Sequence, residues 1–237
     1  MASKKEKKFD KSLYLKTFII STAIFSFGLI VGIYIENFFV SDLATRAREI
    51  ENSVREIELE MLYFQELSSS GEPSKDSCNF LNAIVRKTNK NLDALAGELT
   101  QYSEKNVLFT TQEIRNIKKT YTSLLIKDWL LQERVKKNCG TKIVTVLYFY
   151  STEGCDDCIT QGNVLTLLKS IFKEKLMVFP IDIQIDLSMT EILMNRFNIT
   201  TTPTIVINEK PYKGIIGKAE LMNMICEELP EVDVCKS

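Results

Sequence analysis

Hydrophobic and polar positions follow three different patterns along the chain. Residues 17–35 are 19 uncharged positions rich in Phe, Ile, Leu and Val, which is about the length that crosses the hydrocarbon of a membrane as a helix. Residues 36–139 repeat apolar side chains at helical spacing, and residues 140–237 alternate short apolar runs with helical segments. The pattern therefore predicts a tail at 1–16, one transmembrane helix, an all-α stalk and a C-terminal α/β domain.

The first part of the predicted stalk, residues 36–70, has apolar side chains at alternating spacings of four and three. This heptad stripe has Glu and Arg on the other faces, and it predicts either a coiled coil or one helix of a bundle. The stripe consists of Leu43, Ala47, Ile50, Val54, Ile57, Met61 and Phe64.

Residues 75–139 are expected to form an antiparallel helical hairpin. Helical spacing stops in the stretch from Ser68 to Pro73, and it resumes in two segments of nearly equal length on either side of a short loop around residues 103–109. Equal arms bring Cys78 and Cys139 together at the open end of the hairpin. These two cysteines are candidates for a structural disulfide, and two buried free thiols are the alternative.

Residues 140–237 predict strands and helices in alternation. The strand-like runs are 143–150, 176–185, 205–207 and 212–215, and the helix-like segments are 164–172, 189–197 and 218–229.

Cys155 and Cys158 lie between the first of these strands and the first helix. At the start of a helix, exposed backbone N–H groups stabilise a thiolate at Cys155, and Cys158 lies one turn further along, within reach of its sulfur. A CxxC pair alone is also typical of half a zinc site or of a structural disulfide. The strand before it and the helix after it favour a dithiol redox centre.

This order of elements, with Pro203 opening a strand about 45 residues after the cysteine pair, resembles the thioredoxin superfamily. The resemblance covers residues from about 142 to 230. The segment from Phe197 to Thr204 is similar to the family's segment that ends in Pro-Thr, and Gly214 and Leu221 match its last strand and helix.

The resemblance implies a central mixed sheet flanked by helices and a thiol-disulfide oxidoreductase activity with Cys155 and Cys158 as catalytic residues. It also implies that the peptide bond before Pro203 is cis and lies beside the cysteine pair. Thr202 and Pro203 would then bind the extended backbone of a substrate.

Four positions depart from the family pattern. Gly154 stands where tryptophan is usual, Phe149 stands where a buried aspartate is frequent, and Asp156 and Asp157 lie inside the motif. Two carboxylates near Cys155 oppose the helix dipole and are expected to raise the pKa of its thiol. We therefore expect a more reducing centre than in the oxidising members of the family.

Composition narrows the chemistry further. The chain contains no histidine, which excludes Cys/His zinc sites and catalysis by a histidine base, so no metal is expected. The net charge of −1 gives no overall attraction to nucleic acid. No cofactor is implied beyond the redox-active disulfide itself.

Charges around the apolar stretch predict its orientation. Six lysines and two acidic residues precede it, and Glu36 and Asp42 follow it. By the positive-inside rule, the tail stays in the cytoplasm and the remainder lies outside the cell membrane. A cleaved signal peptide is the alternative reading. Because disulfides persist outside the cytoplasm, Cys226 and Cys235 are candidates for another structural bridge.

The sequence thus predicts a single-pass membrane protein that exchanges disulfides with protein thiols outside the cytoplasm and needs a separate redox partner. The alternative is a thioredoxin-fold binding or scaffold module without redox turnover. Gly28 and Gly32 form a GxxxG motif that would suit a homodimer, and Asn198 opens a glycosylation sequon.

Overall fold

The computed structural model describes residues 11–69, 75–105 and 111–236, and the chain divides into two compact units, Met1–Ile50 and Glu51–Ser237. In its described part, the first unit is the N-terminal portion of helix α1 (Lys11–Ser69). Every side chain from Tyr14 to Tyr34 is exposed, and this 21-residue segment is apolar and long enough to cross a membrane. A signal sequence has the same properties. Most of the predicted basic tail, residues 1–10, lies outside the described residues.

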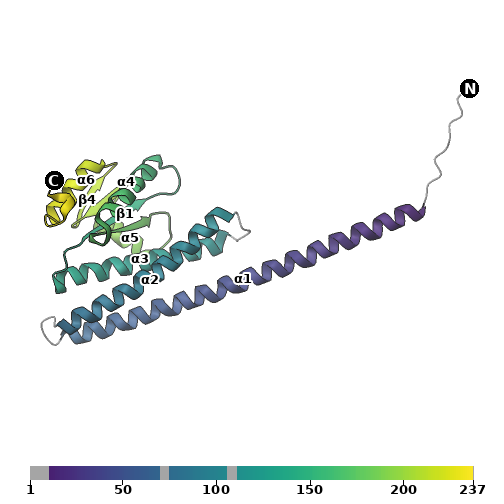
Figure 1. Cartoon of the computed structure of the whole chain (residues 1–237), viewed down its shortest axis with the longest axis horizontal. Helices are drawn as coiled ribbons and strands as arrows, with labels where there is room; N and C mark the ends of the chain where they lie inside the picture. Colours follow the sequence, from purple (N-terminus) through teal and green to yellow (C-terminus); the bar gives the residue numbers. More distant parts are fainter. Residues whose placement is uncertain (1–10, 70–74, 106–110, 237) are drawn as a thin grey trace, which may run out of the picture. The chain divides into compact units, whose positions relative to one another are not determined.

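The second unit begins with helices. The hairpin consists of α2 (Lys75–Lys105) and α3 (Thr111–Cys139), and the end of α1 contacts both arms (Figure 1). Lys87 of α2 forms ion pairs with Glu56 at 2.8 Å and with Glu60 at 2.9 Å. Lys127 of α3 pairs with Glu58 of α1.

The heptad stripe of α1 is described only in part. Ile57 and Phe64 are buried, at 0% and 1% exposure, and the guanidinium of Arg134 lies 5.7 Å from the centre of the Phe64 ring. These stripe positions therefore lie in the helical core of the second unit, as expected for one helix of a bundle. The side chains of Leu43, Ala47, Ile50 and Val54 lie outside the described residues.

A four-stranded mixed sheet follows the hairpin. The strand order is β2-β1-β3-β4, with β1 and β2 parallel and the other two pairs antiparallel. The strands are β1 (Val144–Tyr150), β2 (Leu176–Asp182), β3 (Thr204–Ile207) and β4 (Lys210–Lys213). The helices around them are α4 (Asp156–Phe172), α5 (Ser188–Arg196) and α6 (Lys218–Glu228), with short 3₁₀ turns at Lys173–Lys175 and Asp233–Cys235.

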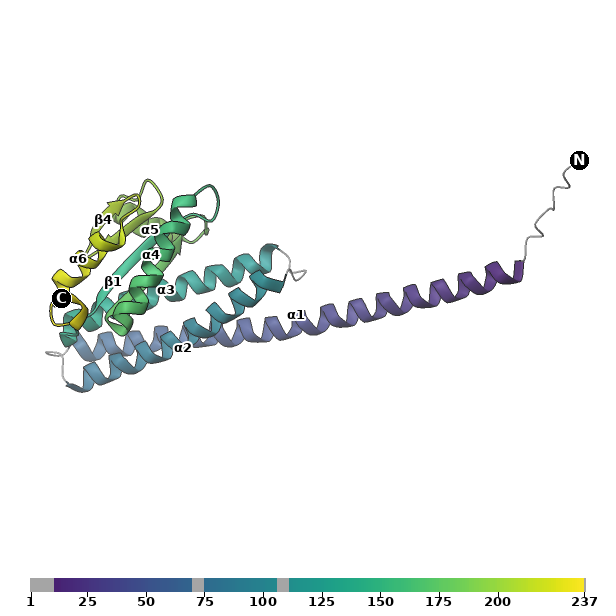
Figure 2. The ribbon, with the colours of Figure 1, turned by 45° about the horizontal axis from the view of Figure 1, so that its top comes forward.

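Successive side chains of β1 point to opposite faces of the sheet, and this alternation builds two layers of core. Val144, Val146 and Tyr148 belong to one hydrophobic cluster with residues of α4 and α6, which lie side by side over that face (Figure 2). On the other face, Thr145 donates a hydrogen bond to Glu133 of α3. The hairpin helix α3 thus packs directly on the sheet.

Strand β2 ends at Asp182, although the apolar run that predicts it continues to Ile185. The carboxylate of Asp182 accepts the backbone N–H of Gln184 at 3.0 Å, and its backbone carbonyl accepts the N–H of Ile185 at 3.2 Å. These two bonds turn the chain out of the sheet. The apolar side chains beyond the turn serve the core without extending the strand.

Candidate functional site

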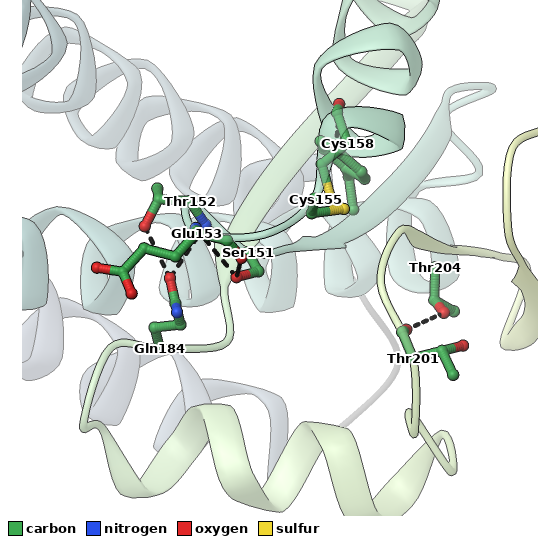
Figure 3. Close-up of a disulfide and its surroundings, with 9 residues drawn as sticks. Ser151, Thr152, Glu153, Cys155, Cys158, Gln184, Thr201 and Thr204 are labelled. Atoms are coloured by element: carbon green, nitrogen blue, oxygen red, sulfur yellow. Dashed lines mark hydrogen bonds between the residues drawn. A yellow bond between two sulfur atoms is a disulfide. The ribbon is translucent and has the colours of Figure 1, made fainter.

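Cys155 and Cys158 form a disulfide at the start of α4, with their Cα atoms 5.3 Å apart (Figure 3). Cys155 is the N-cap residue of the helix and is half-buried, whereas Cys158 is 4% exposed. The backbone N–H of Cys158 donates to the carbonyl of Cys155 at 3.1 Å. Of the two bonded cysteines, Cys155 is therefore the more accessible residue and Cys158 the buried one.

The loop that leads into Cys155 is folded by local bonds. The hydroxyl of Ser151 donates to the carbonyl of Glu153 at 2.7 Å and accepts the N–H of Glu153 at 3.3 Å. Gly154 then has a φ of +69°, in the left-handed region that side chains disfavour. This backbone conformation explains why glycine stands at the position where the resemblance leads one to expect tryptophan.

Three connections meet at this end of the sheet. Tyr150, the last residue of β1, lies opposite Asp182, the last residue of β2, and Phe149 lies opposite Thr204, the first residue of β3. The cysteine loop after β1, the β2–α5 connection and the Thr201–Pro203 turn before β3 therefore share one edge. This edge is the candidate functional site.

The turn before β3 contains the cis peptide bond between Thr202 and Pro203. The hydroxyl of Thr204 donates to the carbonyl of Thr201 at 2.6 Å (Figure 3). The carbonyl of Pro203 accepts the N–H of Gly214 at 2.9 Å. Pro203 is buried, while Thr202 remains partly accessible at the surface. The turn is thus held by hydrogen bonds at Pro203 and Thr204, and Thr202 between Thr201 and Pro203 stays partly accessible.

Two tyrosines form the floor beside the disulfide. The Tyr148 and Tyr150 rings stack with centroids 5.4 Å apart, and burial raises the pKa of each hydroxyl to about 12, so both stay protonated at neutral pH. A hollow of about 370 Å³ opens between these rings and the cysteines. Its lining is Tyr148, Tyr150, Ser151, Thr152, Gly154, Cys155, Asp156, Cys158 and Ile159.

Asp156 and Asp157 occupy the first turn of α4, and both side chains are exposed. Carboxylates in a first turn stabilise the helix itself through its dipole. The same position puts their charge near Cys155, so the residues have a structural role whatever their effect on the thiol.

The other four cysteines form two separate disulfides. Cys78 bonds Cys139 with 5.7 Å between Cα atoms, and Cys226 bonds Cys235 with 5.3 Å between Cα atoms. Neither pair belongs to the edge where Cys155 lies. Among the described residues, no group of three or more His, Cys, Asp or Glu side chains could hold a metal ion.

Two polar residues near the site are not evident from motif patterns. Gln161 is fully buried in α4, and its side-chain oxygen accepts the N–H of Ile216 at 2.7 Å, which ties the motif helix to the segment before α6. Gln184 reaches from the β2–α5 connection to the cysteine loop, where its side-chain oxygen accepts two bonds from Thr152. Gln161 lies on the same helical stripe as Leu165 and Leu168. A polar residue among apolar residues on one helical face is the sequence signal that points to it.

A second, larger cavity of about 840 Å³ lies away from the cysteines, between the hairpin and β2. Asp128 of α3 lines it, is 1% exposed and accepts a hydrogen bond from Gln132 at 3.4 Å. Burial raises the pKa of this carboxyl to about 7, and the bond from Gln132 and the charge of Lys169 oppose the rise only in part. Lys169, on the far wall, donates instead to the carbonyl of Leu176 at 2.6 Å.

No family model matches the chain, and no curated protein matches it. Solved structures do match. Chloroplastic thioredoxin z aligns with a TM-score of 0.33 and 18% identity over 42% of this chain and 89% of that one. A malarial protein aligns with a TM-score of 0.30 and 22% identity over 37% and 98%, and the germline-specific thioredoxin Deadhead of Drosophila melanogaster with 0.32 and 23% over 43% and 92%.

The arrangement of strands and helices in this chain itself indicates its fold. The sheet is mixed and has β1 in its interior. Helices α4 and α6 cover one face and α3 packs on the other, which matches a thioredoxin-like fold.

Proposed function

We propose that this chain is a membrane-anchored thiol-disulfide oxidoreductase that acts outside the cytoplasm through Cys155 and Cys158. One observation carries the proposal: of the two cysteines in a disulfide at the N-terminus of a helix, one is partly exposed and the other is buried. A purely structural bridge has no need of that asymmetry, whereas disulfide exchange needs an accessible attacking thiol and a shielded resolving thiol.

In the reducing direction, the Cys155 thiolate attacks one sulfur of a client disulfide. The client S–S bond breaks, a Cys155–client S–S bond forms, and one client sulfur leaves as a thiolate. Cys158, as its thiolate, then attacks the Cys155 sulfur, which releases the second client thiolate and restores the Cys155–Cys158 disulfide. Two electrons pass from the pair to the client, and the reverse sequence oxidises a client dithiol.

The client would lie along the edge of the sheet described above. The partly accessible Thr202, next to the buried cis Pro203, supports pairing with an extended client segment in the manner of an added strand. The hollow beside Cys155, with its aromatic floor, supports a place for a client side chain next to the reacting cysteine. The clients are protein thiols or disulfides, a second redox protein must reset the pair, and no cofactor beyond the disulfide takes part.

Chemical trapping on the full chain tests the activity. Cys158→Ser should accumulate mixed disulfides between Cys155 and client proteins, and Cys155→Ser should accumulate none. Cys226→Ser with Cys235→Ser is the matched control, because it removes a disulfide away from the site. Alkylation of Cys155 only after mild reduction is expected. A pair that resists reduction in the folded protein would instead favour the scaffold reading.

The membrane part of the proposal needs its own measurement. The apolar segment Tyr14–Tyr34 supports an anchor, and the lysines before it support a cytoplasmic N-terminus. In intact cells, a membrane-impermeant maleimide should label Cys155 after reduction by an impermeant phosphine. Labelling only after lysis would contradict the proposed orientation, and loss of the segment from the mature chain would identify a signal peptide.

A further inference from the structure

One side chain joins the cysteine loop to a neighbouring element. The side-chain oxygen of Gln184 accepts the backbone N–H of Thr152 at 3.1 Å and the hydroxyl of Thr152 at 2.8 Å (Figure 3). Thr152 lies three positions before Cys155 in the chain. A single amide oxygen therefore holds both the backbone and the side chain of the loop.

Gln184 is itself fixed in place. Its backbone N–H donates to the carboxylate of Asp182 at 3.0 Å, and Asp182 is 5% exposed at the end of β2. The N–H of Ile183 donates to the carbonyl of Tyr150 at 2.9 Å, which binds the same connection to the end of β1. The β2–α5 connection is thus anchored to the sheet before the Gln184 side chain extends from it.

The loop has little else to hold it. The bonds between Ser151 and Glu153 stay within the loop, and a Cβ built on Gly154 would meet no atom within 4 Å. Among the hydrogen bonds found in the described residues, those to Gln184 are the ones that connect residues 151–154 to another element. Release of Gln184 would leave the loop tethered at its two ends alone.

We propose that Gln184 is a positioning residue that holds the cysteine loop so that Cys155 stays within bonding range of Cys158 when the disulfide opens. The inference rests on the proposed function in treating Cys155 and Cys158 as a pair that cycles. The disulfide restrains the loop in the oxidised state by itself. In the dithiol state the restraint falls to Gln184, and without it the open loop gains conformational freedom. Loss of Gln184 therefore favours the dithiol.

The test is the equilibrium constant between disulfide and dithiol, measured on the full chain in detergent against reduced and oxidised glutathione. Gln184→Ala should shift it toward the dithiol by about threefold to tenfold, which is about 1 kcal/mol, because the loop gains conformational freedom in the dithiol state alone. A tenfold shift corresponds to a reduction potential less negative by about 30 mV. The change in thermal stability is recorded in parallel.

Thr152 supplies matched variants that leave Gln184 in place. Thr152→Val removes the hydroxyl donor and retains the N–H, so it should shift the equilibrium in the same direction and by less. Thr152→Ser retains both donors and should keep the wild-type equilibrium constant. In a double variant with Gln184→Ala, Thr152→Val should cause no further shift in the equilibrium constant, because the acceptor oxygen of Gln184 is already absent. Thr120→Val, which removes a hydroxyl bonded at 3.1 Å to the carbonyl of Asn116 on α3, is the control for loss of a surface hydrogen bond.

The outcomes separate the inference from the function beneath it. If the wild-type pair does not exchange with glutathione or dithiothreitol, the proposed function fails, and the inference fails with it. If the wild type exchanges but Gln184→Ala and Thr152→Val keep its equilibrium constant, the inference alone is wrong. A fall in melting temperature with an unchanged potential would likewise reduce Gln184 to a structural residue. Should Gln184→Ala not fold, the Thr152 pair of variants decides.

Discussion

The hydroxyl of Tyr148 donates a hydrogen bond to the backbone carbonyl of Cys158 at 2.5 Å. Tyr148 lies in the middle of the sheet and is 5% exposed, so the bond joins the central strand to the first turn of α4. The buried cysteine is therefore held through its backbone, which leaves its sulfur available for the disulfide.

We expect Tyr148→Phe to lower the free energy of unfolding by about 1 kcal/mol, the usual net value of a buried hydrogen bond. The pKa of Tyr148, about 12, keeps the donor protonated, so the loss should be the same across the neutral pH range. Urea unfolding of the two proteins measures it. Tyr150→Phe is the control, because that stacked hydroxyl does not hold Cys158, and an equal loss in both variants would contradict the assigned role.

The sequence was informative where local pattern decides structure. The apolar run before the cysteine pair predicts β1, and the observed strand, Val144–Tyr150, begins one residue inside the run. A strand that is buried on both faces appears in the sequence as a continuous apolar run, which can be recognised without knowing the strands that pair with it. The helical spacing after the pair predicts α4, because its buried residues Leu165, Leu168 and Phe172 lie on one face of the helix.

Sequence reasoning failed where a polar side chain bonds across a long separation. Gln184 lies 32 positions from Thr152, and Gln161 lies 55 positions from Ile216. No local periodicity links such pairs, because their contact exists only after the sheet has assembled. Asp128 offered a weak signal, since it lies on the same helical stripe as Leu124 and Leu131, where a buried carboxyl is unexpected.

The two carboxylates inside the cysteine motif lead to a further prediction. Replacement of Asp156 and Asp157 by Asn should lower the pKa of the Cys155 thiol by about half a unit to one unit, because two negative charges no longer oppose the thiolate. The reduced form is then stabilised and the pair becomes more oxidising. Both side chains are exposed, so added salt should shrink the difference.

Ultraviolet absorbance of the thiolate against pH in the reduced protein measures this shift. Glu227→Gln with Glu228→Gln removes the same charge from the exposed end of α6 and should leave the titration where it was. A titration that does not move in the Asp156/Asp157 variant would assign these carboxylates to the helix dipole or to partner choice.

Asp128 predicts how stability depends on pH. Burial raises its pKa in the folded protein from 3.8 to about 7. Between these values the folded protein keeps a proton that the unfolded chain has released, so stability falls as pH rises from about 4 to about 7 and is level above. The titratable groups that line the same cavity are Lys169 in the last turn of α4, Lys173, Glu174 and Lys175 of the 3₁₀ turn after it, Arg86 and Asp93 of α2, and Tyr121 of α3.

Asp128→Asn keeps the oxygen that accepts the bond from Gln132 and removes the ionisation. The variant should equal the wild type near pH 4 and exceed it above pH 7 by at most about 4 kcal/mol, which is the full free energy of the pKa difference. Melting temperatures of both proteins across this range test the sign. Asp233→Asn, at an exposed position, is the control, and an Asn variant less stable than the wild type at high pH would show that the carboxylate is favourably paired.

The disulfide between Cys78 and Cys139 joins the start of α2 to the last residue of α3 and encloses 61 positions of chain. In the chain-entropy model a loop of this length stabilises the folded state by about 4 kcal/mol, whereas the loop of 9 positions between Cys226 and Cys235 gives about 2.5 kcal/mol. Paired Cys→Ser replacement should therefore destabilise the protein more at Cys78/Cys139 than at Cys226/Cys235.

Because α3 also packs on the sheet, loosening the hairpin should loosen the face of the sheet opposite α4 and α6. Hydrogen exchange in the Cys78→Ser/Cys139→Ser variant should rise in α2 and α3 first and in β1 next. Increasing concentrations of dithiothreitol should reduce Cys155–Cys158 before Cys78–Cys139. The Cys78–Cys139 disulfide is expected to stabilise the fold and to take no part in disulfide exchange. Peptide mapping under non-reducing conditions follows each bond, and a Cys78 that is free or joined to another cysteine would remove the link that closes the hairpin.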